Sequence, residues 1–167
     1  MKHNIVPIIN QYFSCHQAIL ATYASYQKRE YDMIFADSWG FGYKKDECPF
    51  GSSLSPGYQN RRNILLENFH GIRINEEQYT GKESLKNLIQ TILPYSPIIL
   101  FCDVFDCPWN ISYRKNHIEH YILITSVDND VNNFTVLDPY STEKENIIHI
   151  DNVAPNNGCI NSFIILP

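Results

Sequence analysis

The sequence has no long apolar segment, and no stretch of it approaches the roughly 20 consecutive apolar residues that a membrane-spanning helix needs. Residues 1–10 also lack the apolar stretch of a secretory signal peptide. We therefore expect a cytoplasmic protein that has no membrane partner.

Cysteines are few and irregularly spaced. There are five of them, an odd number, and no two are separated as in a CxxC motif. This pattern argues against a disulfide framework and fits a reducing compartment. The residues that would have to form a zinc site are Cys15, His16, Cys102, His117 and His120. No pair among them has the spacing of a structural site, so we expect no metal and no other bound cofactor.

Basic residues are also sparse. The chain has 13 Lys and Arg against 18 Asp and Glu, for a net charge of −5, and the basic residues are scattered. A nucleic-acid partner is therefore not expected. By contrast, 44% of the residues are hydrophobic and 13% are aromatic, which predicts a packed core. A chain of 167 residues predicts a single domain over residues 1–167.

The pattern of apolar residues predicts helices first and strands later. The expected helices cover 15–28, 60–69 and 82–93, with Ser14 capping the first and Gly71 ending the second. The expected strands cover 98–103, 121–127, 134–138, 147–150 and 162–166. This order indicates an α+β fold in which N-terminal helices pack on an antiparallel β-sheet.

Cys15 is the candidate nucleophile, because it stands where an extended lead-in turns into a helix. A helix N-terminus favours the thiolate, which is the reactive form of cysteine. The N–H groups there can also stabilise the oxyanion that forms when a carbonyl is attacked. Gln11 or Asn10, just upstream, is placed to add a side-chain donor.

His120 and Asp138 are the candidate partners of Cys15. If strands 121–127 and 134–138 form a hairpin, the position opposite Asp138 is two or three residues from His120. That makes them diagonal neighbours within about 7–8 Å. His117 is five or six residues from the same position, roughly 16–20 Å along a strand. The distances therefore select His120 as the base.

The hairpin register sets a condition on this pair. Asp138 lies opposite residue 122 or residue 123, and side chains alternate between the two faces of a sheet. His120 and Asp138 share a face only if Asp138 is opposite an even-numbered residue. An odd register without a bulge would separate the two side chains.

Four further residues are candidates for oxyanion or substrate binding. They are Gln11, His16, Trp39 and Asp103. Trp39 belongs to an aromatic stretch that fits either the core or an acyl pocket. Asp103 follows a buried strand and fits either a structural turn or contact with an amine substrate.

The ordered set of these features carries a family resemblance. It comprises Cys15 on its helix, the segments 39–43, 97–103, 106–109 and 113–115, and the strand motifs 120–124 and 134–139. In this set the chain resembles the amino-terminal domain of the butirosin biosynthesis protein H family. That family lies within the papain-like and C39-like cysteine peptidase fold group. The resemblance implies the papain-like fold, with the nucleophile on the first helix.

The resemblance also implies a cysteine acyltransferase of secondary-metabolite biosynthesis. Cys15 would take an acyl group from the phosphopantetheine thioester of an acyl or peptidyl carrier protein. His120, oriented by Asp138, would accept the thiol proton and then deprotonate a small amine acceptor.

Two other functions fit the same residues. A cysteine peptidase or amidase needs the same Cys15, His120 and Asp138, and differs only in its substrate. A binding or regulatory domain that keeps the fold without catalysis is the third possibility. It would have a Cys15 pKa near that of a free thiol, about 8.5.

Overall fold

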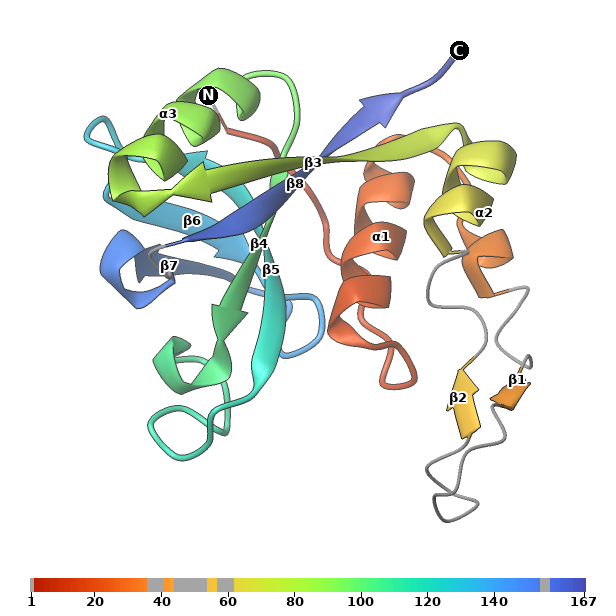
Figure 1. Cartoon of the computed structure of the whole chain (residues 1–167), viewed down its shortest axis with the longest axis horizontal. Helices are drawn as coiled ribbons and strands as arrows, with labels where there is room; N and C mark the ends of the chain where they lie inside the picture. The colour runs from red at the N-terminus through yellow and green to blue at the C-terminus, as the bar shows by residue number, and fades with distance from the viewer. Residues whose placement is uncertain (1, 36–40, 44–53, 57–61, 154–156) are drawn as a thin grey trace.

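The computed structural model describes residues 2–35, 41–43, 54–56, 62–153 and 157–167. Its main element is a six-stranded antiparallel sheet with the strand order β3-β8-β4-β5-β6-β7 (Figure 1). The strands are β3 (Ile72–Thr80), β4 (Ile98–Asp103), β5 (Glu119–Val127), β6 (Asn133–Leu137), β7 (Glu145–His149) and β8 (Asn157–Ile165). A separate antiparallel pair joins β1 (Phe41–Tyr43) to β2 (Leu54–Pro56).

In the described part of the chain, three α-helices accompany the sheet: α1 (Cys15–Tyr26), α2 (Arg62–His70) and α3 (Gly81–Ile92). The α+β class predicted from the sequence is confirmed. No helix in the described part of the chain combines the length and the hydropathy that crossing a membrane requires.

Helix α1 begins where the sequence predicts, because Ser14 caps it. The Ser14 hydroxyl accepts a hydrogen bond from the Gln17 N–H, and the Gln17 side chain accepts one from the Ser14 N–H. This reciprocal pair is a capping box, which satisfies two backbone donors that would otherwise lack partners. Cys15 is therefore the first helical residue.

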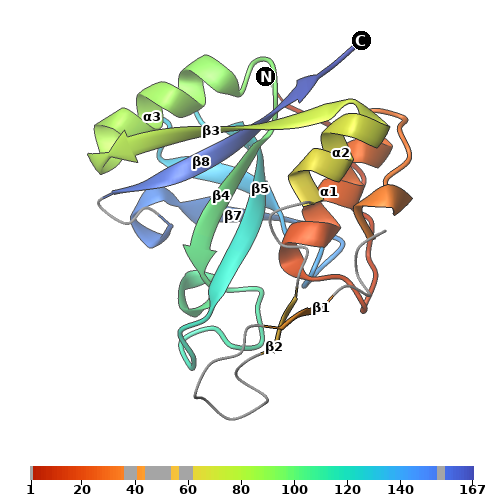
Figure 2. The same ribbon diagram turned by 45° about the vertical axis from the view of Figure 1, so that its right-hand side comes forward.

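The sheet separates two apolar cores, because successive strand residues point to opposite faces. Leu85 and Ile89 of α3 pack with Leu100 and Ile122 on one face. On the other face the apolar side of α1 packs against the sheet: Ile19 and Leu20 of α1 pack with Ile99 and Leu123. Figure 2 shows α1 and α2 to the right of the sheet and α3 at its upper left, along β3.

The predicted elements are present, with ends shifted by a few residues, but the sequence prediction missed β3 and the short strands β1 and β2. Most side chains of β3 are polar and at least partly exposed, and only Ile72 and Tyr79 are buried. Since β3 is an edge strand, it pairs only with β8 and has no need of a continuous apolar pattern.

Candidate active site

Cys15 opens onto a cavity of about 570 Å³ that also contains His120. One wall comes from the segment between β4 and β5, through Val104, Trp109, Ile111 and Ile118, among others. Tyr140, which follows β6, also lines the cavity and lies 5.9 Å from the His120 ring, centroid to centroid. The candidate nucleophile is thus accessible, whereas His120 is buried with 3% of its surface exposed.

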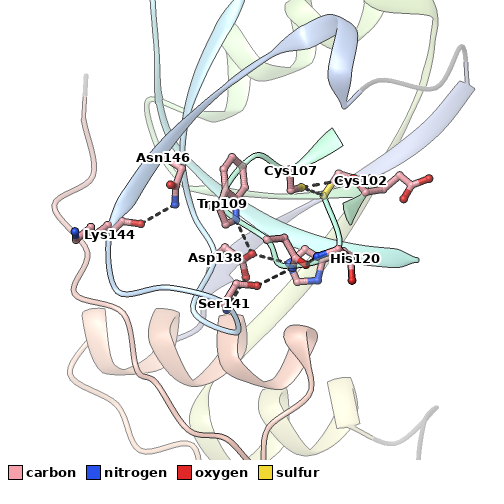
Figure 3. Close-up of polar contacts among 11 residues, drawn as sticks. Cys102, Cys107, Trp109, His120, Asp138, Ser141, Lys144 and Asn146 are labelled. Carbon is pink, nitrogen blue, oxygen red and sulfur yellow. Dashed lines mark hydrogen bonds and ion pairs between the residues drawn. The ribbon is translucent and has the colours of Figure 1, made fainter. Parts of the chain in front are cut away.

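His120 and Asp138 form a buried pair. The Nε2 atom of His120 lies 2.9 Å from Oδ2 of Asp138, and Asp138 is fully buried (Figure 3). Among the described residues, Nε2 finds no partner with the alignment of a linear hydrogen bond, so the contact is a close ion pair. Because Nε2 faces the carboxylate, Nδ1 is the ring nitrogen left for Cys15.

Two donors hold the Asp138 carboxylate in place. The Trp109 indole Nε1–H donates to Oδ2 at 2.8 Å, and the Ser141 backbone N–H donates to Oδ1 at 3.2 Å (Figure 3). Burial alone would raise the pKa of Asp138, but pairing with His120 and bonding to Trp109 lower it overall. Asp138 therefore stays ionised beside the imidazole.

The titration of Cys15 and His120 favours a charge pair. Burial raises the pKa of the Cys15 thiol, but hydrogen bonding to His120 and its positive charge lower it overall, aided by the backbone of Tyr121 and His16. Burial likewise lowers the pKa of His120, yet pairing with Asp138 and Cys15 raises it to about 10. Both shifts act in the direction that favours a thiolate–imidazolium pair over a neutral thiol–imidazole pair.

The observed register meets the condition that the sequence set. Leu123 pairs with Leu137, so the next step along the two strands places Asp138 opposite Ile122. This is an even-numbered position, and Asp138 therefore shares a face with His120. His117 instead lies 2.7 Å from Asp103 and is 74% exposed at its side chain, outside the Cys15–His120–Asp138 cluster.

Of the four other candidates, the three that the structure describes, Gln11, His16 and Asp103, do not line the cavity with Cys15. His16 is turned to a packed site, with its ring 5.4 Å from that of Tyr121 and its Nδ1 3.3 Å from Arg62. Burial and the Arg62 charge lower the pKa of His16 to about 4, so its side chain is neutral. Its backbone, by contrast, contributes to lowering the Cys15 pKa.

The contacts of Asp103 hold the backbone of its own segment. Its carboxylate accepts hydrogen bonds from the N–H groups of Phe105 and Ile118, and it pairs with His117. It thereby joins the two ends of the segment that forms the cavity wall. Gln11 is exposed in the turn before α1 and does not line the cavity. Trp39 lies outside the described residues.

Several residues near the site had no predicted role. Trp109 belongs to a segment that contributed to the family resemblance, but only the folded chain shows its indole on Asp138. Two buried thiols, Cys102 and Cys107, lie with their sulfur atoms 3.7 Å apart (Figure 3). The contact with Cys107 and burial both raise the pKa of Cys102, so it remains a thiol. Within the described ranges, no three His, Cys, Asp or Glu side chains are placed to hold a metal ion.

Comparison with known families identifies the group to which the chain is related. The model of the Peptidase C39 like family matches residues 6–157. The chain belongs to the peptidase C39-like family. Within this family, the Cys15 helix packed on a six-stranded antiparallel sheet is the C39-like, papain-like arrangement.

Solved structures agree on the fold of this C39-like chain. The peptidase domain of Streptococcus ComA, a bifunctional ABC transporter involved in quorum sensing, matches with a TM-score of 0.54 and 14% identity. The match covers 99% of this chain and 98% of that one. A C39-like peptidase from Bacillus anthracis matches with a TM-score of 0.55 and 14% identity, covering 99% and 97%. No curated protein sequence matches the chain.

Proposed function

We propose that this C39-like chain is a cysteine hydrolase that cleaves peptide or amide bonds. The observation that carries the proposal is the buried His120–Asp138 pair beside Cys15, with pKa shifts that favour a thiolate and an imidazolium. A nucleophile, a proton carrier and a group that orients the carrier are the components that thiol catalysis requires.

The first half of the reaction forms an acyl-enzyme. The Cys15 thiolate attacks the carbonyl carbon, a C–S bond forms, and the carbonyl oxygen takes the negative charge. N–H groups at the start of α1 are placed to stabilise that oxyanion. His120 then donates its proton to the amine nitrogen as the C–N bond breaks. Asp138 keeps the ring oriented, because Trp109 and Ser141 fix its carboxylate.

The second half returns the enzyme to its starting state. Neutral His120 takes a proton from a water molecule as the water oxygen attacks the acyl carbon. The C–S bond breaks, the carboxylic acid leaves, and Cys15 is again a thiolate beside a protonated His120. The cycle uses the three side chains, the N–H groups at the start of α1 and one water molecule.

The cavity points to an apolar group near the scissile bond. Its side chains include Val104, Trp109, Ile111 and Ile118, together with the ring of Tyr140. Ile111 and Ile118 are 87% and 51% exposed, so apolar surface next to Cys15 is open to a ligand.

A peptide library digested without any thioester tests the hydrolase function. Mass spectrometry should find cleavage by the wild type and none by Cys15→Ala. Cleavage that survives Cys15→Ala would refute the proposal. A wild type without cleavage whose Cys15 pKa is near 8.5 would favour a non-catalytic binding domain.

A second candidate function is acyl transfer from a carrier-protein thioester to an amine. One observation favours it: Glu119 places a carboxylate in the lining of the cavity, where it suits a cationic amine acceptor. Cys15 would displace the phosphopantetheine thiol, and the amine would replace water in the second step. Intact-mass analysis with an acyl-carrier protein tests this. A Cys15 adduct that an amine discharges faster than water supports transfer, and discharge unaffected by the amine contradicts it.

A further inference from the structure

The hairpin of β5 and β6 contains one extra residue. Next to its turn, Val127 pairs with Phe134 and Ser126 pairs with Thr135. The following pair is Ile124 with Val136, so β5 advances two residues while β6 advances one. Thr125 is therefore a β-bulge, a residue without a partner in the ladder.

The bulge decides where Asp138 lies. If the pairing next to the turn continued without it, the partner of Asp138 would be Leu123. Leu123 faces the core beneath α1, whereas Ile122 faces the core beneath α3. Asp138 would then point to the opposite face of the sheet from His120. With the bulge, Asp138 is opposite Ile122, and the 2.9 Å contact with His120 forms.

Two hydrogen bonds outside the ladder hold the bulge. The Thr125 carbonyl accepts from the His3 backbone N–H at 3.0 Å. The Thr125 hydroxyl donates to the Thr135 carbonyl at 3.3 Å. Both groups belong to the stretch where the extra residue interrupts the regular pairing, and Thr125 is fully buried.

The N-terminal segment is itself anchored. His3 is 8% exposed, and its Nε2 lies 2.6 Å from the Leu93 carbonyl oxygen, at the end of α3. Since a carbonyl only accepts, Nε2 is the donor. In Figure 1 this segment starts beside α3 and runs to the helix that carries Cys15. His3 thus links the end of α3 to the bulge.

We infer that Thr125 and His3 are positioning residues for the His120–Asp138 pair. They hold the bulge that sets the register, and they contact none of the reacting groups. The inference rests on the proposed function for the roles of Cys15, His120 and Asp138. If the bulge is loosened, the pairing of Asp138 with His120 should weaken.

The test is the pH dependence of Cys15 alkylation by iodoacetamide, measured by peptide mapping so that the other cysteines do not interfere. Thr125→Val removes the hydroxyl and keeps the β-branched shape, while Thr125→Ser keeps the hydroxyl. His3→Pro removes the backbone N–H, while His3→Ala keeps it. Asp138→Asn is the positive control, and thermal melts confirm that each variant is folded.

Thr125→Val and His3→Pro should move the alkylation midpoint upward relative to Thr125→Ser and His3→Ala. The direction should match that of Asp138→Asn. The rate at a pH below the midpoint falls about tenfold for each pKa unit gained by Cys15. Folded Thr125→Val and His3→Pro variants with the wild-type profile, next to a shifted Asp138→Asn, overturn the inference.

Deletion of Thr125 keeps the inference falsifiable if those variants do not fold. The deletion makes the ladder continuous and leaves Asp138 opposite Ile122, so the wild-type profile should be retained. In that background His3→Pro should have no further effect, because its bonding partner is gone. A folded deletion variant, with or without His3→Pro, whose alkylation midpoint moves upward as in Asp138→Asn contradicts the inference. Alkylation needs no substrate, so a wild type that cleaves no peptide refutes the proposed function without affecting this result.

Discussion

Replacing Asp138 with Asn tests the electrostatic core of the site. Asn has nearly the same shape and can still accept a hydrogen bond from Trp109, so the substitution removes mainly the charge. His120 is 3% exposed, and its pKa of about 10 lies above the ordinary 6.5 because of Asp138 and Cys15. The 2.9 Å contact makes Asp138 a principal source of this shift.

The expected change follows from that contact. An opposite charge at this distance shifts a pKa by about 1–3 units, which corresponds to about 1–4 kcal/mol. We therefore expect Asp138→Asn to lower the pKa of His120 by about 1–3 units. The equilibrium constant between the thiolate–imidazolium pair and the neutral thiol–imidazole pair should fall by about ten- to a thousandfold, because each unit of pKa is a factor of ten. The first chemical step should slow accordingly, since the thiolate is the nucleophile.

NMR titration of the imidazole signals measures the pKa of His120 directly. Asp103→Asn is the matched control, because it neutralises a carboxylate that pairs with a different histidine, His117, at 2.7 Å. That pair is exposed and lies outside the Asp138 cluster, so the His120 titration should not change. An Asp138→Asn variant with the wild-type pKa for His120 would refute the reasoning.

Three other predictions address the surroundings of the site. Trp109→Phe should keep most of the packing but remove the 2.8 Å bond to Asp138, which costs about 1–3 kcal/mol and lowers kcat. Melting curves and turnover check this, and an unchanged kcat would contradict it. Ser14→Ala should destabilise the chain by about 1 kcal/mol, seen as a melting temperature about 2–4 °C lower, because it removes the cap of α1. An unchanged melting temperature would count against it. Because the folded pKa of His120 is raised, its pairing stabilises the fold fully below pH 6.5 and is lost as the pH rises through about 10. Unfolding of the wild type and His120→Gln, compared at several pH values, should show their difference shrinking over that range, and a constant difference would be inconsistent with the pairing.

Much of the fold follows from local sequence patterns. The apolar stripe of α3 and the capping residues of α1 are enough to place both helices. The continuous apolar run of β4 predicts a buried strand with the observed bounds, Ile98–Asp103. The sequence does not predict the edge strand β3, because polar residues separate its few buried residues.

The site is only partly readable from the sequence. Chain order and strand spacing select Cys15, His120 and Asp138 as candidates. They do not tell whether Asp138 lies opposite an even-numbered or an odd-numbered residue of the hairpin. The bulge at Thr125 sets this register. The sequence does not predict the bulge, because residues 122–124 are apolar on both faces of the sheet. The role of Trp109 cannot be predicted from the sequence either, because its hydrogen bond to Asp138 joins a loop to a strand end 29 residues away.

Rapid acid quenching of the wild type with an excess of a cleavable peptide tests the central claim most directly. The acyl-enzyme should appear in intact-mass spectra as the mass of the acyl fragment, and peptide mapping should place it on Cys15. Cys15→Ala should form no adduct. Cleavage that proceeds with no adduct on Cys15, or with the acyl group on another residue, would contradict the account.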